Sequence, residues 1–385
     1  MTDMALASEA RSGHSAATDT ATAVRDVLDQ LGDIDAAAVA FFAAPTHDGA
    51  AIAARFAERF PGVPTIGCTT AGEFHQDALS DGGLSAVALP GSVVRRAVAT
   101  VAELNGDPKA GIRAGVAVLE EKLGSSLRDL DPQRYVGLVL IDGTHAVEER
   151  VNEALGDAAP LLSFVGGTAA DDLKFVETQV FSGTTMSTNG VALLVLELSV
   201  PYTIVKTSSF EPAGRTFAIT KADNERRIVW EMDGRPAAEV FAEAVGASID
   251  ELDFARFAGN PLGLMIDGSP WIRCAQEVVE GNGLKFACEI LEGMDVELMK
   301  HTDLVRDTTA ALRDAVDQVG GQASGAVLFN CVYRKLQIGA QQLEDQFITS
   351  LGTVPAAGFH TYGESWLGNM NYTLTGVVFG RSASS

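Results

Sequence analysis

The chain has 385 residues, of which 46% are hydrophobic and 21% are charged, a composition typical of a globular protein with room for two domains. Its 51 acidic and 28 basic side chains give a formal net charge of −23, which argues against nucleic acid and anionic membranes as partners. The four cysteines have no C-x-x-C spacing, so neither a zinc ribbon nor a dithiol redox motif is expected.

The first 20 residues are rich in Ala, Ser, Thr and Asp and predict a mobile tail. They lack a basic stretch followed by an apolar run, so we expect no secretory signal. No later segment approaches the roughly 18–20 apolar residues of a membrane span. With the cysteines interpreted as reduced thiols, these features favour a cytoplasmic protein.

After the tail, the same series of elements is predicted three times along the chain. Each series has a leading helix, an apolar strand, a polar turn, a second helix with apolar residues at i, i+4 and i+8, a glycine-rich loop and a closing strand. The opening and closing strands cover residues 36–42 and 84–89, then 135–141 and 191–198, then 325–329 and 372–379. The polar turns cover residues 45–48, 142–145 and 330–334. The apolar stripes of the second helices are Ile52, Phe56 and Phe60; Val147, Val151 and Leu155; and Leu343, Phe347 and Leu351.

Between the second and third series, residues 201–300 alternate between polar and apolar types and predict antiparallel ribbons with a helix at about 236–245. The chain as a whole predicts an α/β fold of repeated strand–helix–strand units, with mixed, largely parallel sheets in two domains. We place a flexible tail and leading helix at residues 1–30 and a first domain of two α/β units at 31–200. The second domain, at 201–385, combines the ribbons with a third unit at 301–385.

The glycine-rich loops of the first and third series repeat one phrase, P-x-x-G-x-x-T-x-G-E, at residues 64–73 and 355–364. A looser version occupies residues 160–172. Glycines around small polar residues suit strand ends where the backbone approaches another group closely. Ligands of open α/β sheets bind beyond the carboxyl ends of the strands, so we expect these loops and the polar turns to share one site.

Several side chains of these loops are therefore candidates for ligand binding. They are Cys68, Thr69, Thr70, Glu73, Gly166, Gly167, Asp171, Asn330, Arg334, His360, Tyr362 and Glu364. The alternative for each is a structural one, in which glycines form tight turns and the Thr and Glu side chains cap nearby backbone. The identical positions of Glu73 and Glu364 favour a shared structural role such as binding loop N–H groups. Arg334 could contact a ligand carboxylate or Glu364.

Three loop histidines, His47, His145 and His360, are possible metal or haem ligands, although a histidine that donates to a loop carbonyl is commoner. No H-x-x-H spacing, P-loop, G-x-S-x-G or dinucleotide fingerprint occurs. Cys68 with a nearby histidine could form a nucleophile–base pair, but nothing marks the rest of a triad. We therefore expect no enzyme.

Five segments resemble motifs of the FIST family, in the family's order. They are IGCTTAGEF at residues 66–74, VGGTAADDLKF at 165–175, NPLG at 260–263, NCVYR at 330–334 and GFHTYGE at 358–364. Asn371 and Thr373 fall where that family tends to have N-x-T. The resemblance covers residues 36–380 and implies a FIST N-terminal domain at 31–200 and a FIST C-terminal domain at 201–385.

The resemblance implies a bacterial, cytoplasmic signal-transduction module that binds small molecules such as amino acids and reports to a partner. Some family members are described as haem proteins that sense nitric oxide and regulate histidine kinases or cyclic-dinucleotide enzymes. Position 360 is histidine where the family commonly has an aromatic residue, so the pocket could be more polar. The sequence shows no kinase or cyclase segment, so we expect a separate output protein. The leading hypothesis is a sensor of a small polar, amino-acid-like ligand. A haem-based nitric oxide sensor and an enzyme with a Cys68 nucleophile are the alternatives.

Overall fold

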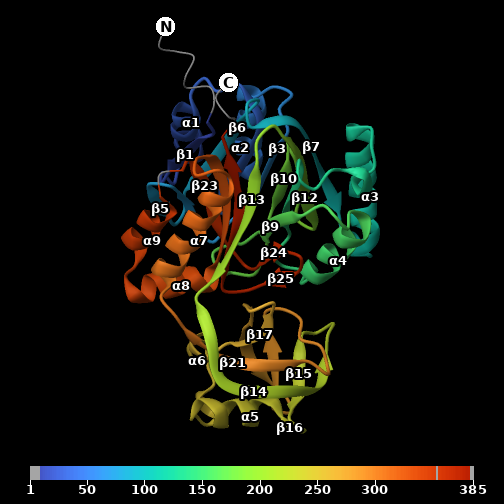
Figure 1. Cartoon of the computed structure of the whole chain (residues 1–385), viewed down its shortest axis with the longest axis vertical. Coiled ribbons are helices and arrows are strands. Elements are labelled where there is room, and N and C mark those ends of the chain that lie inside the picture. Colours follow the sequence, from blue (N-terminus) through green and yellow to red (C-terminus); the bar gives the residue numbers. More distant parts are fainter. Residues whose placement is uncertain (1–8, 353, 382–385) are drawn as a thin grey trace.

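The computed structural model describes residues 9–352 and 354–381 and shows a mixed α/β protein. Figure 1 shows a large body and a smaller lobe below it, coloured yellow to orange. The long strand β14 (Phe210–Asp223) carries the chain into the lobe, and β21 (Asp295–His301) pairs with it on the way back. The lobe is therefore an insertion between two parts of the body.

Three six-stranded sheets form the body, and all three share one order of strands. The first is β1 (Arg11–Ser15), β6 (Leu84–Pro90), β2 (Ala36–Ala43), β3 (Thr65–Thr69), β10 (Val180–Ser182) and β11 (Thr185–Ser187). The second is β7 (Val94–Glu103), β12 (Gly190–Leu198), β8 (Tyr135–Ile141), β9 (Phe164–Thr168), β24 (Glu364–Trp366) and β25 (Asn369–Met370). The third is β13 (Tyr202–Ser208), β26 (Thr373–Gly380), β22 (Ala323–Cys331), β23 (Ala356–Thr361), β4 (Glu73–His75) and β5 (Ala78–Ser80).

The hairpin at the end of each sheet comes from a different series of the chain. Hairpin β4–β5 follows β3 but pairs with β23, β10–β11 follows β9 but pairs with β3, and β24–β25 follows β23 but pairs with β9. The exchange is thus cyclic, and it interlocks the three sheets. Hairpin β4–β5 pairs with β23, and hairpin β24–β25 pairs with β9, so both join segments on opposite sides of residue 200. The domain boundary that the sequence places there stays a prediction.

The prediction of largely parallel sheets is wrong. Among the described strands, only β2–β3, β8–β9 and β22–β23 pair in parallel. Each crossover produces one parallel pair, and the closing strand then returns antiparallel on the other side of the opening strand. The hairpin added at the far end is antiparallel as well, so antiparallel pairs dominate.

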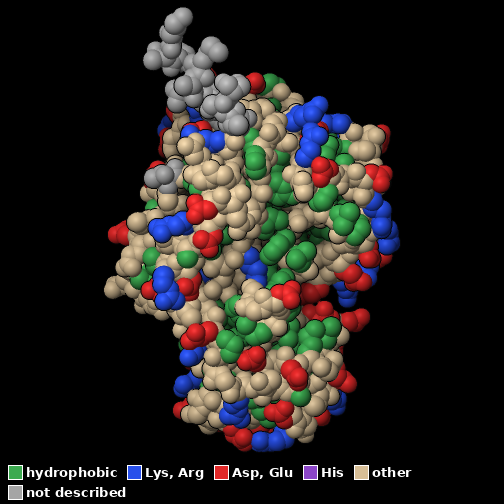
Figure 2. Space-filling model, in the orientation of Figure 1, with side chains coloured by type: hydrophobic (Ala, Val, Ile, Leu, Met, Phe, Trp, Pro, Cys, Tyr) green, Lys and Arg blue, Asp and Glu red, His purple; other side chains and the backbone are tan. Residues whose placement is uncertain are grey.

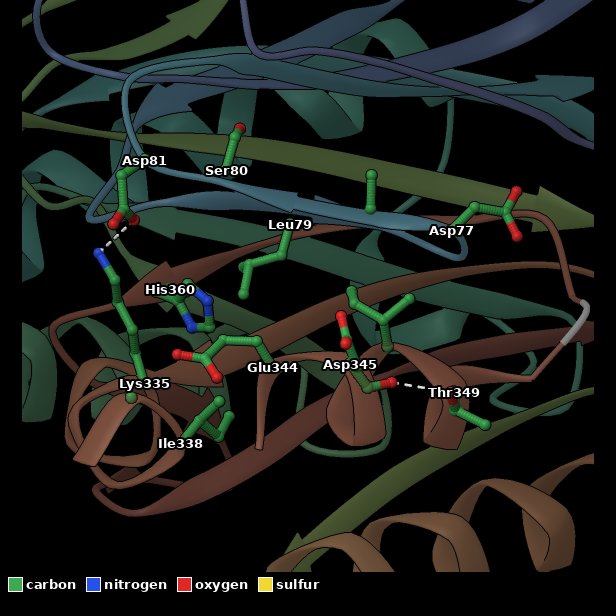
Figure 3. A pocket seen from close by; sticks show the side chains of 13 residues that line it. Asp77, Leu79, Ser80, Asp81, Lys335, Ile338, Glu344, Asp345, Thr349 and His360 are labelled. Carbon is green, nitrogen blue, oxygen red and sulfur yellow. Dashed lines mark hydrogen bonds and ion pairs between the residues drawn. The ribbon is translucent and has the colours of Figure 1, made fainter. Parts of the chain in front are cut away.

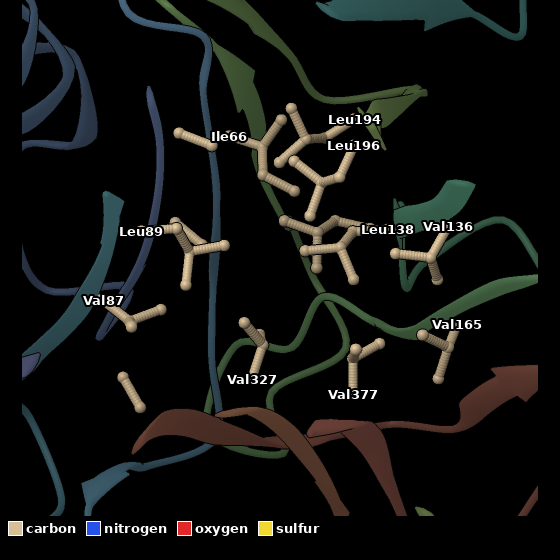
Figure 4. Close-up of a cluster of buried hydrophobic side chains, with 14 of the residues drawn as sticks. Ile66, Val87, Leu89, Val136, Leu138, Val165, Leu194, Leu196, Val327 and Val377 are labelled. Atoms are coloured by element: carbon tan, nitrogen blue, oxygen red, sulfur yellow. The ribbon is translucent and has the colours of Figure 1, made fainter. Parts of the chain in front are cut away.

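One hydrophobic core lies where the three sheets face each other, and it explains the strands that are apolar on both faces. It includes Ile66, Val87, Leu138, Val165, Leu194, Val327 and Val377, which come from all three sheets (Figure 4). Separate clusters lie between the outer faces of the sheets and the helices. A strand buried on both faces needs apolar residues at successive positions.

The leading helices are α1 (Thr20–Leu31), α3 (Pro108–Leu123) and α7 (Leu304–Gln318). The crossover helices are α2 (Gly49–Arg59), α4 (Glu148–Ala158) and, in the third series, the pair α8 (Val332–Gln341) and α9 (Glu344–Leu351). Short 3₁₀ turns cover Leu127–Asp129 and Ile249–Glu251. None of the described helices combines the length and the apolar character that crossing a membrane requires.

Two local predictions need correction. The mobile tail predicted over the first 20 residues is wrong for β1, which pairs with β6; residues 1–8 lie outside the described part of the chain. The polar turn predicted at residues 330–334 is also shorter, because α8 begins at Val332. The residues NCVYR therefore place Tyr333 and Arg334 on a helix rather than in a loop.

The lobe is built from antiparallel strands, as predicted, around a core of its own that includes Phe217, Phe241 and Phe257. Its other elements are β15 (Ile228–Met232), β16 (Arg235–Pro236), β17 (Leu262–Ile266), β18 (Ser269–Arg273), β19 (Ala275–Val279), β20 (Gly283–Phe286), α5 (Ala237–Val245) and α6 (Phe254–Gly259). Arg227 of the lobe pairs with Glu148 and Glu149 at the start of α4. Figure 2 shows hydrophobic side chains gathered along the junction, with acidic side chains around them.

Candidate functional site

The three glycine-rich loops meet at one place in the body, as the repeated phrase predicts. Backbone hydrogen bonds join them in pairs: Ala71 N to His360 O (3.0 Å), His360 N to Gly72 O (2.8 Å), Ala170 N to Thr69 O (3.0 Å), Thr168 N to Gly363 O (2.8 Å) and Tyr362 N to Thr168 O (3.2 Å). The loops therefore support one another, and side chains that are almost 300 residues apart in the chain become neighbours.

The two repeated glutamates have the same structural role. Glu73 is fully buried and accepts hydrogen bonds from the hydroxyl of Thr70, three residues earlier, and from Gly83 N at 2.8 Å. Glu364 is equally buried and accepts from Thr361, again three residues earlier, and from Thr373 N at 3.1 Å. Both side chains thus hold the start of the closing strand.

Burial raises the pKa of Glu73 to about 8 and that of Glu364 to about 7, because it disfavours the charged form more than the hydrogen bonds favour it. Their oxygens are used inside the loops, and neither glutamate is among the residues that line the two cavities described below. Both glutamates therefore support the glycine loops and line neither cavity.

Other candidates from the first two loops are also buried in the junction. Thr69 accepts a hydrogen bond from Gln179 N at 3.0 Å, and Thr70 donates to Glu73. Gly166 and Gly167 lie in β9, where a Cβ at Gly166 would be 1.7 Å from the carbonyl oxygen of Val139. The glycines are there because strands approach too closely for a side chain.

Cys68 is fully buried in β3, and burial, followed by the nearby Glu73, raises the pKa of its thiol well above the usual value. The other cysteines, Cys274, Cys288 and Cys331, are buried free thiols too. A thiolate nucleophile needs the opposite environment.

We expect the four thiols of the folded protein to resist iodoacetamide near neutral pH and to react readily once the chain is unfolded in denaturant. Intact-mass spectrometry of native and denatured samples counts the labelled cysteines directly. Rapid labelling of Cys68 in the native protein, ahead of the other three, would support the enzymatic alternative instead.

A polar cavity of ≈ 750 Å³ opens beside the loop junction, between the β4–β5 hairpin and helices α8 and α9 (Figure 3). Its lining includes Asp77, Ser80, Asp81, Lys335, Ile338, Glu344, Asp345, Thr349 and His360. His360 is fully buried at the inner end, whereas the carboxylates are exposed at the rim. Of the residues predicted from the sequence, only His360 lines this cavity.

A hydrogen-bond network sets the protonation of His360. The Nε of Arg334 can only donate, and it donates to Asn330 Oδ1 at 2.8 Å. This fixes the orientation of the Asn330 amide, whose Nδ2 then donates to His360 Nδ1 at 2.9 Å. The neutral imidazole therefore carries its proton on Nε2, which has no partner among the described residues. Burial, assisted by Lys335 and Arg334, lowers the pKa of His360 well below its usual value and keeps the ring neutral.

Arg334 itself does not contact Glu364. The guanidinium is 1% exposed and donates to Asn330, to Ser209 Oγ at 3.2 Å and to Thr308 Oγ1 at 2.6 Å. Burial lowers its pKa to about 10, which still leaves it protonated at neutral pH. Its role in the site is to orient Asn330 and, through it, His360.

Lys335 provides the positive charge of the cavity. Its Nζ lies 2.6 Å from Asp81 Oδ1 and donates to the carbonyl oxygen of Ala71 at 2.7 Å. Gly72 makes this arrangement possible: its φ is 117°, and a Cβ there would be 3.1 Å from Lys335 Nζ and 2.9 Å from Asp81 Oδ1. The first glycine loop therefore fixes the ammonium group of Lys335 through the Ala71 carbonyl, and the third glycine loop carries His360.

A second, more aromatic cavity of ≈ 610 Å³ lies between the body and the lobe. Tyr362 and Phe175 of the body line it as a stacked pair, with ring centroids 4.5 Å apart, and Tyr333 stacks on Phe254 of the lobe at 5.4 Å. The predicted residue Asp171 supports this wall, since it accepts the hydroxyl of Tyr362 and the backbone N–H groups of residues 175–177.

The loop histidines do not fit a haem bound through His360 or His47. Iron would need the Nε2 lone pair of His360, but the Asn330 orientation leaves a proton there. Both ring nitrogens of His47 have partners, Thr20 Oγ1 and Gly82 O. His145 holds Asp142 through Nδ1 at 2.6 Å, and it lines neither of the two cavities. Within the described residues, no group of three or more His, Cys, Asp or Glu side chains is arranged to hold a metal ion.

The sequence missed most of the cavity lining. Lys335 directly follows the NCVYR segment, and Asp81 follows the first glycine loop by eight residues. Their closeness in sequence to these motifs could have identified them as candidate site residues. Glu344 and Asp345 carry no such signal, because only the packing of α9 against the β4–β5 hairpin brings them to the cavity.

The interlocked sheets, the inserted lobe and the cavity beside the glycine loops define a mixed α/β protein with an antiparallel lobe inserted between two parts of its body. The family model of the FIST N domain matches residues 37–235, more than half of the chain, and that of the FIST C domain matches residues 237–366. The chain belongs to the FIST family, whose domains are associated with the sensing of small ligands in signal transduction. The resemblance noted in the sequence is thereby confirmed.

The chain is also similar to the uncharacterized protein MJ1623 of Methanocaldococcus jannaschii, with 25% identity over 312 residues. The match covers 69% of this chain and 59% of that protein, so the chain spans less than two thirds of the length of this relative.

Proposed function

We propose that the chain is a cytoplasmic sensor that binds a small polar, amino-acid-like ligand in the cavity beside His360. The observation that carries this proposal is the buried Nε2–H of His360, which lines the cavity and has no partner within the part of the chain that the structure describes. A buried donor without an acceptor is costly, so a ligand that supplies an acceptor gains the hydrogen bond and relieves that cost. Lys335 adjoins the same region, so a carboxylate is the acceptor that suits both groups.

The ammonium group of such a ligand finds carboxylates on the same cavity wall. Figure 3 shows the side chain of Glu344 directed toward the space near His360 and Lys335. A zwitterion would therefore place its carboxylate against the donors and its ammonium group against Glu344. The proposal needs no covalent chemistry, which agrees with the inert environment of Cys68.

Helix α8 offers a route from the cavity to the lobe. Lys335 and Ile338 of this helix line the polar cavity, whereas Val332 and Tyr333 line the aromatic one. Tyr333 also accepts a hydrogen bond from Gln276 of the lobe at 3.4 Å. A ligand that moves α8 would change the packing of the lobe, and a separate signalling protein, such as a histidine kinase or a cyclic-dinucleotide enzyme, would respond to that change.

Thermal unfolding with a panel of the standard amino acids tests the proposal, because a ligand that binds only the native state must raise the melting temperature. We expect at least one amino acid to do so in the parent protein. Lys335→Met and His360→Phe should abolish this ligand-dependent rise, since each removes a donor. His145→Ala, at a histidine outside the cavity, is the matched control and should keep it.

The rise with ligand is compared within each variant, so a lower starting stability does not obscure the result. Lys335 is partly exposed, and its removal is expected to leave the fold intact. A rise that persists unchanged in both Lys335→Met and His360→Phe would place the ligand elsewhere. No rise with any amino acid would contradict the proposed ligand class.

A further inference from the structure

We infer that the ligand of the polar cavity is cationic overall: a basic amino acid that carries a positive charge on its side chain in addition to its α-ammonium group. This inference rests on the function proposed above and names the class of ligand more narrowly. It starts from the charges around the cavity, which are strongly unbalanced. Four carboxylates line it, from Asp77, Asp81, Glu344 and Asp345, against the single ammonium group of Lys335.

The one positive charge is already engaged. Lys335 Nζ lies 2.6 Å from Asp81, so this pair is neutral as a unit. Neither Glu344 nor Asp345 forms an ion pair with any of the residues that the structure describes, and the same holds for Asp77. The cavity therefore presents three carboxylates that have no cationic side chain of the described residues as an ion-pair partner, and a bound cation could balance their charge.

Acidic residues in the first turn of a helix are favoured by the helix dipole, so the position of Glu344 and Asp345 at the start of α9 is not sufficient by itself. The independent observation is His360, which is fully buried and whose Nε2–H points to a ligand acceptor in the same cavity. A ligand must bring a hydrogen-bond acceptor to His360 without adding negative charge to a cavity that is already acidic.

A neutral zwitterion supplies the acceptor but leaves the excess of carboxylates unchanged. An acidic amino acid makes the excess larger. A basic amino acid supplies the carboxylate for His360 and Lys335, the α-ammonium group for Glu344 and a second cation for Asp345. In Figure 3 the carboxylate of Asp345 lies farther along the cavity wall than that of Glu344, where an extended side chain would reach it.

The expected preference for basic amino acids is small because the carboxylates that would bind them are exposed to solvent. Glu344 and Asp345 are exposed, and an exposed ion pair contributes about 0.2–1 kcal/mol. Glutamine also places its α-ammonium group against Glu344, so only the pair with Asp345 separates the ligands. That pair predicts that lysine, ornithine and arginine bind about 1.4- to 5-fold more tightly than glutamine at low ionic strength. The difference should shrink as salt is added, because exposed charges are screened.

Isothermal titration calorimetry with L-lysine, L-ornithine, L-arginine, L-glutamine and L-glutamate tests this directly on the full chain. We expect the order basic, then neutral, then acidic. Asp345→Asn should reduce the preference for lysine over glutamine while the affinity for glutamine changes little. Glu344→Gln should weaken both ligands alike, because both place their α-ammonium group against Glu344. Glu292→Gln, an exposed acidic residue of the lobe, is the matched control and should leave the preference unchanged.

The outcomes separate the two proposals. If glutamine or glutamate binds as tightly as lysine, the cationic class is overturned while the amino-acid sensor stands. The same conclusion follows if the preference for lysine survives in the double variant of Glu344→Gln and Asp345→Asn. If none of the five compounds binds, the proposed function falls together with this inference.

Discussion

Replacement of Gly166 by alanine is expected to lower the free energy of unfolding by at least about 3 kcal/mol, a large share of the roughly 5–15 kcal/mol by which proteins are usually stable. The methyl group would lie 1.7 Å from the carbonyl oxygen of Val139, an atom of the neighbouring strand β8 that cannot rotate away. The strands β8 and β9 would have to separate, and β9 also holds the exchanged hairpin β24–β25. One methyl group would therefore disturb the second sheet and the loop junction together.

Gly156→Ala is the matched control for this prediction. Gly156 lies in helix α4, and nothing is within 4 Å of the position where a Cβ would be added. Alanine favours a helix over glycine, so this variant should be more stable than the parent by about 0.5–1 kcal/mol. Chemical denaturation of both variants measures the two changes, and a Gly166→Ala protein as stable as the parent would show that the strands are farther apart than described.

The second large effect is a loss of stability as pH rises from about 4.5 to 8, caused by the two buried glutamates. The pKa of Glu73 is about 8 and that of Glu364 about 7 in the folded state, above the ordinary value of 4.5. The folded protein therefore holds protons that the unfolded chain has released, so the contribution is present below about pH 4.5 and is lost as pH rises toward 8. We expect the pair to lower the free energy of unfolding by a few kcal/mol across this interval.

Glu73→Gln and Glu364→Gln isolate this effect, because glutamine resembles the protonated acid in shape and cannot ionise. The slope of unfolding free energy against pH between 5 and 8 should be smaller in each variant than in the parent. Partly buried histidines such as His14, whose pKa falls to about 4, change stability in the opposite direction at the acidic end, and the comparison of variants removes their contribution. Identical slopes in the parent and both variants would mean that the carboxylates stay ionised.

The sequence predicted the meeting of the glycine loops because the information is local. The phrase that ends in Glu73 and again in Glu364 contains its own hydrogen-bond partner, a threonine three residues earlier, so identical letters imply identical loops. The helical stripes are equally local, and Ile52, Phe56 and Phe347 are buried as expected.

The pairing between strands that are distant in the chain could not be predicted from local sequence. The hairpin β4–β5 is an ordinary pair of short strands in sequence, and nothing in its residues reveals that its partner is β23 rather than its own β3. The cavity depends on this pairing, because it brings Asp81 next to Lys335. Arg334 illustrates the same limit: its charge suggested an acidic partner, but its three acceptors, Asn330, Ser209 and Thr308, are neutral.

The cyclic exchange of hairpins also has a consequence for co-translational folding on the ribosome. The sheet that contains β2 and β3 is completed only by β10 and β11, which are synthesised more than a hundred residues later. The sheet that contains β8 and β9 is completed by β24 and β25, close to the end of the described chain. An emerging N-terminal half would thus expose unpaired strand edges until β24 has been synthesised. Nascent chains of this protein should accordingly depend on holding factors for much of translation.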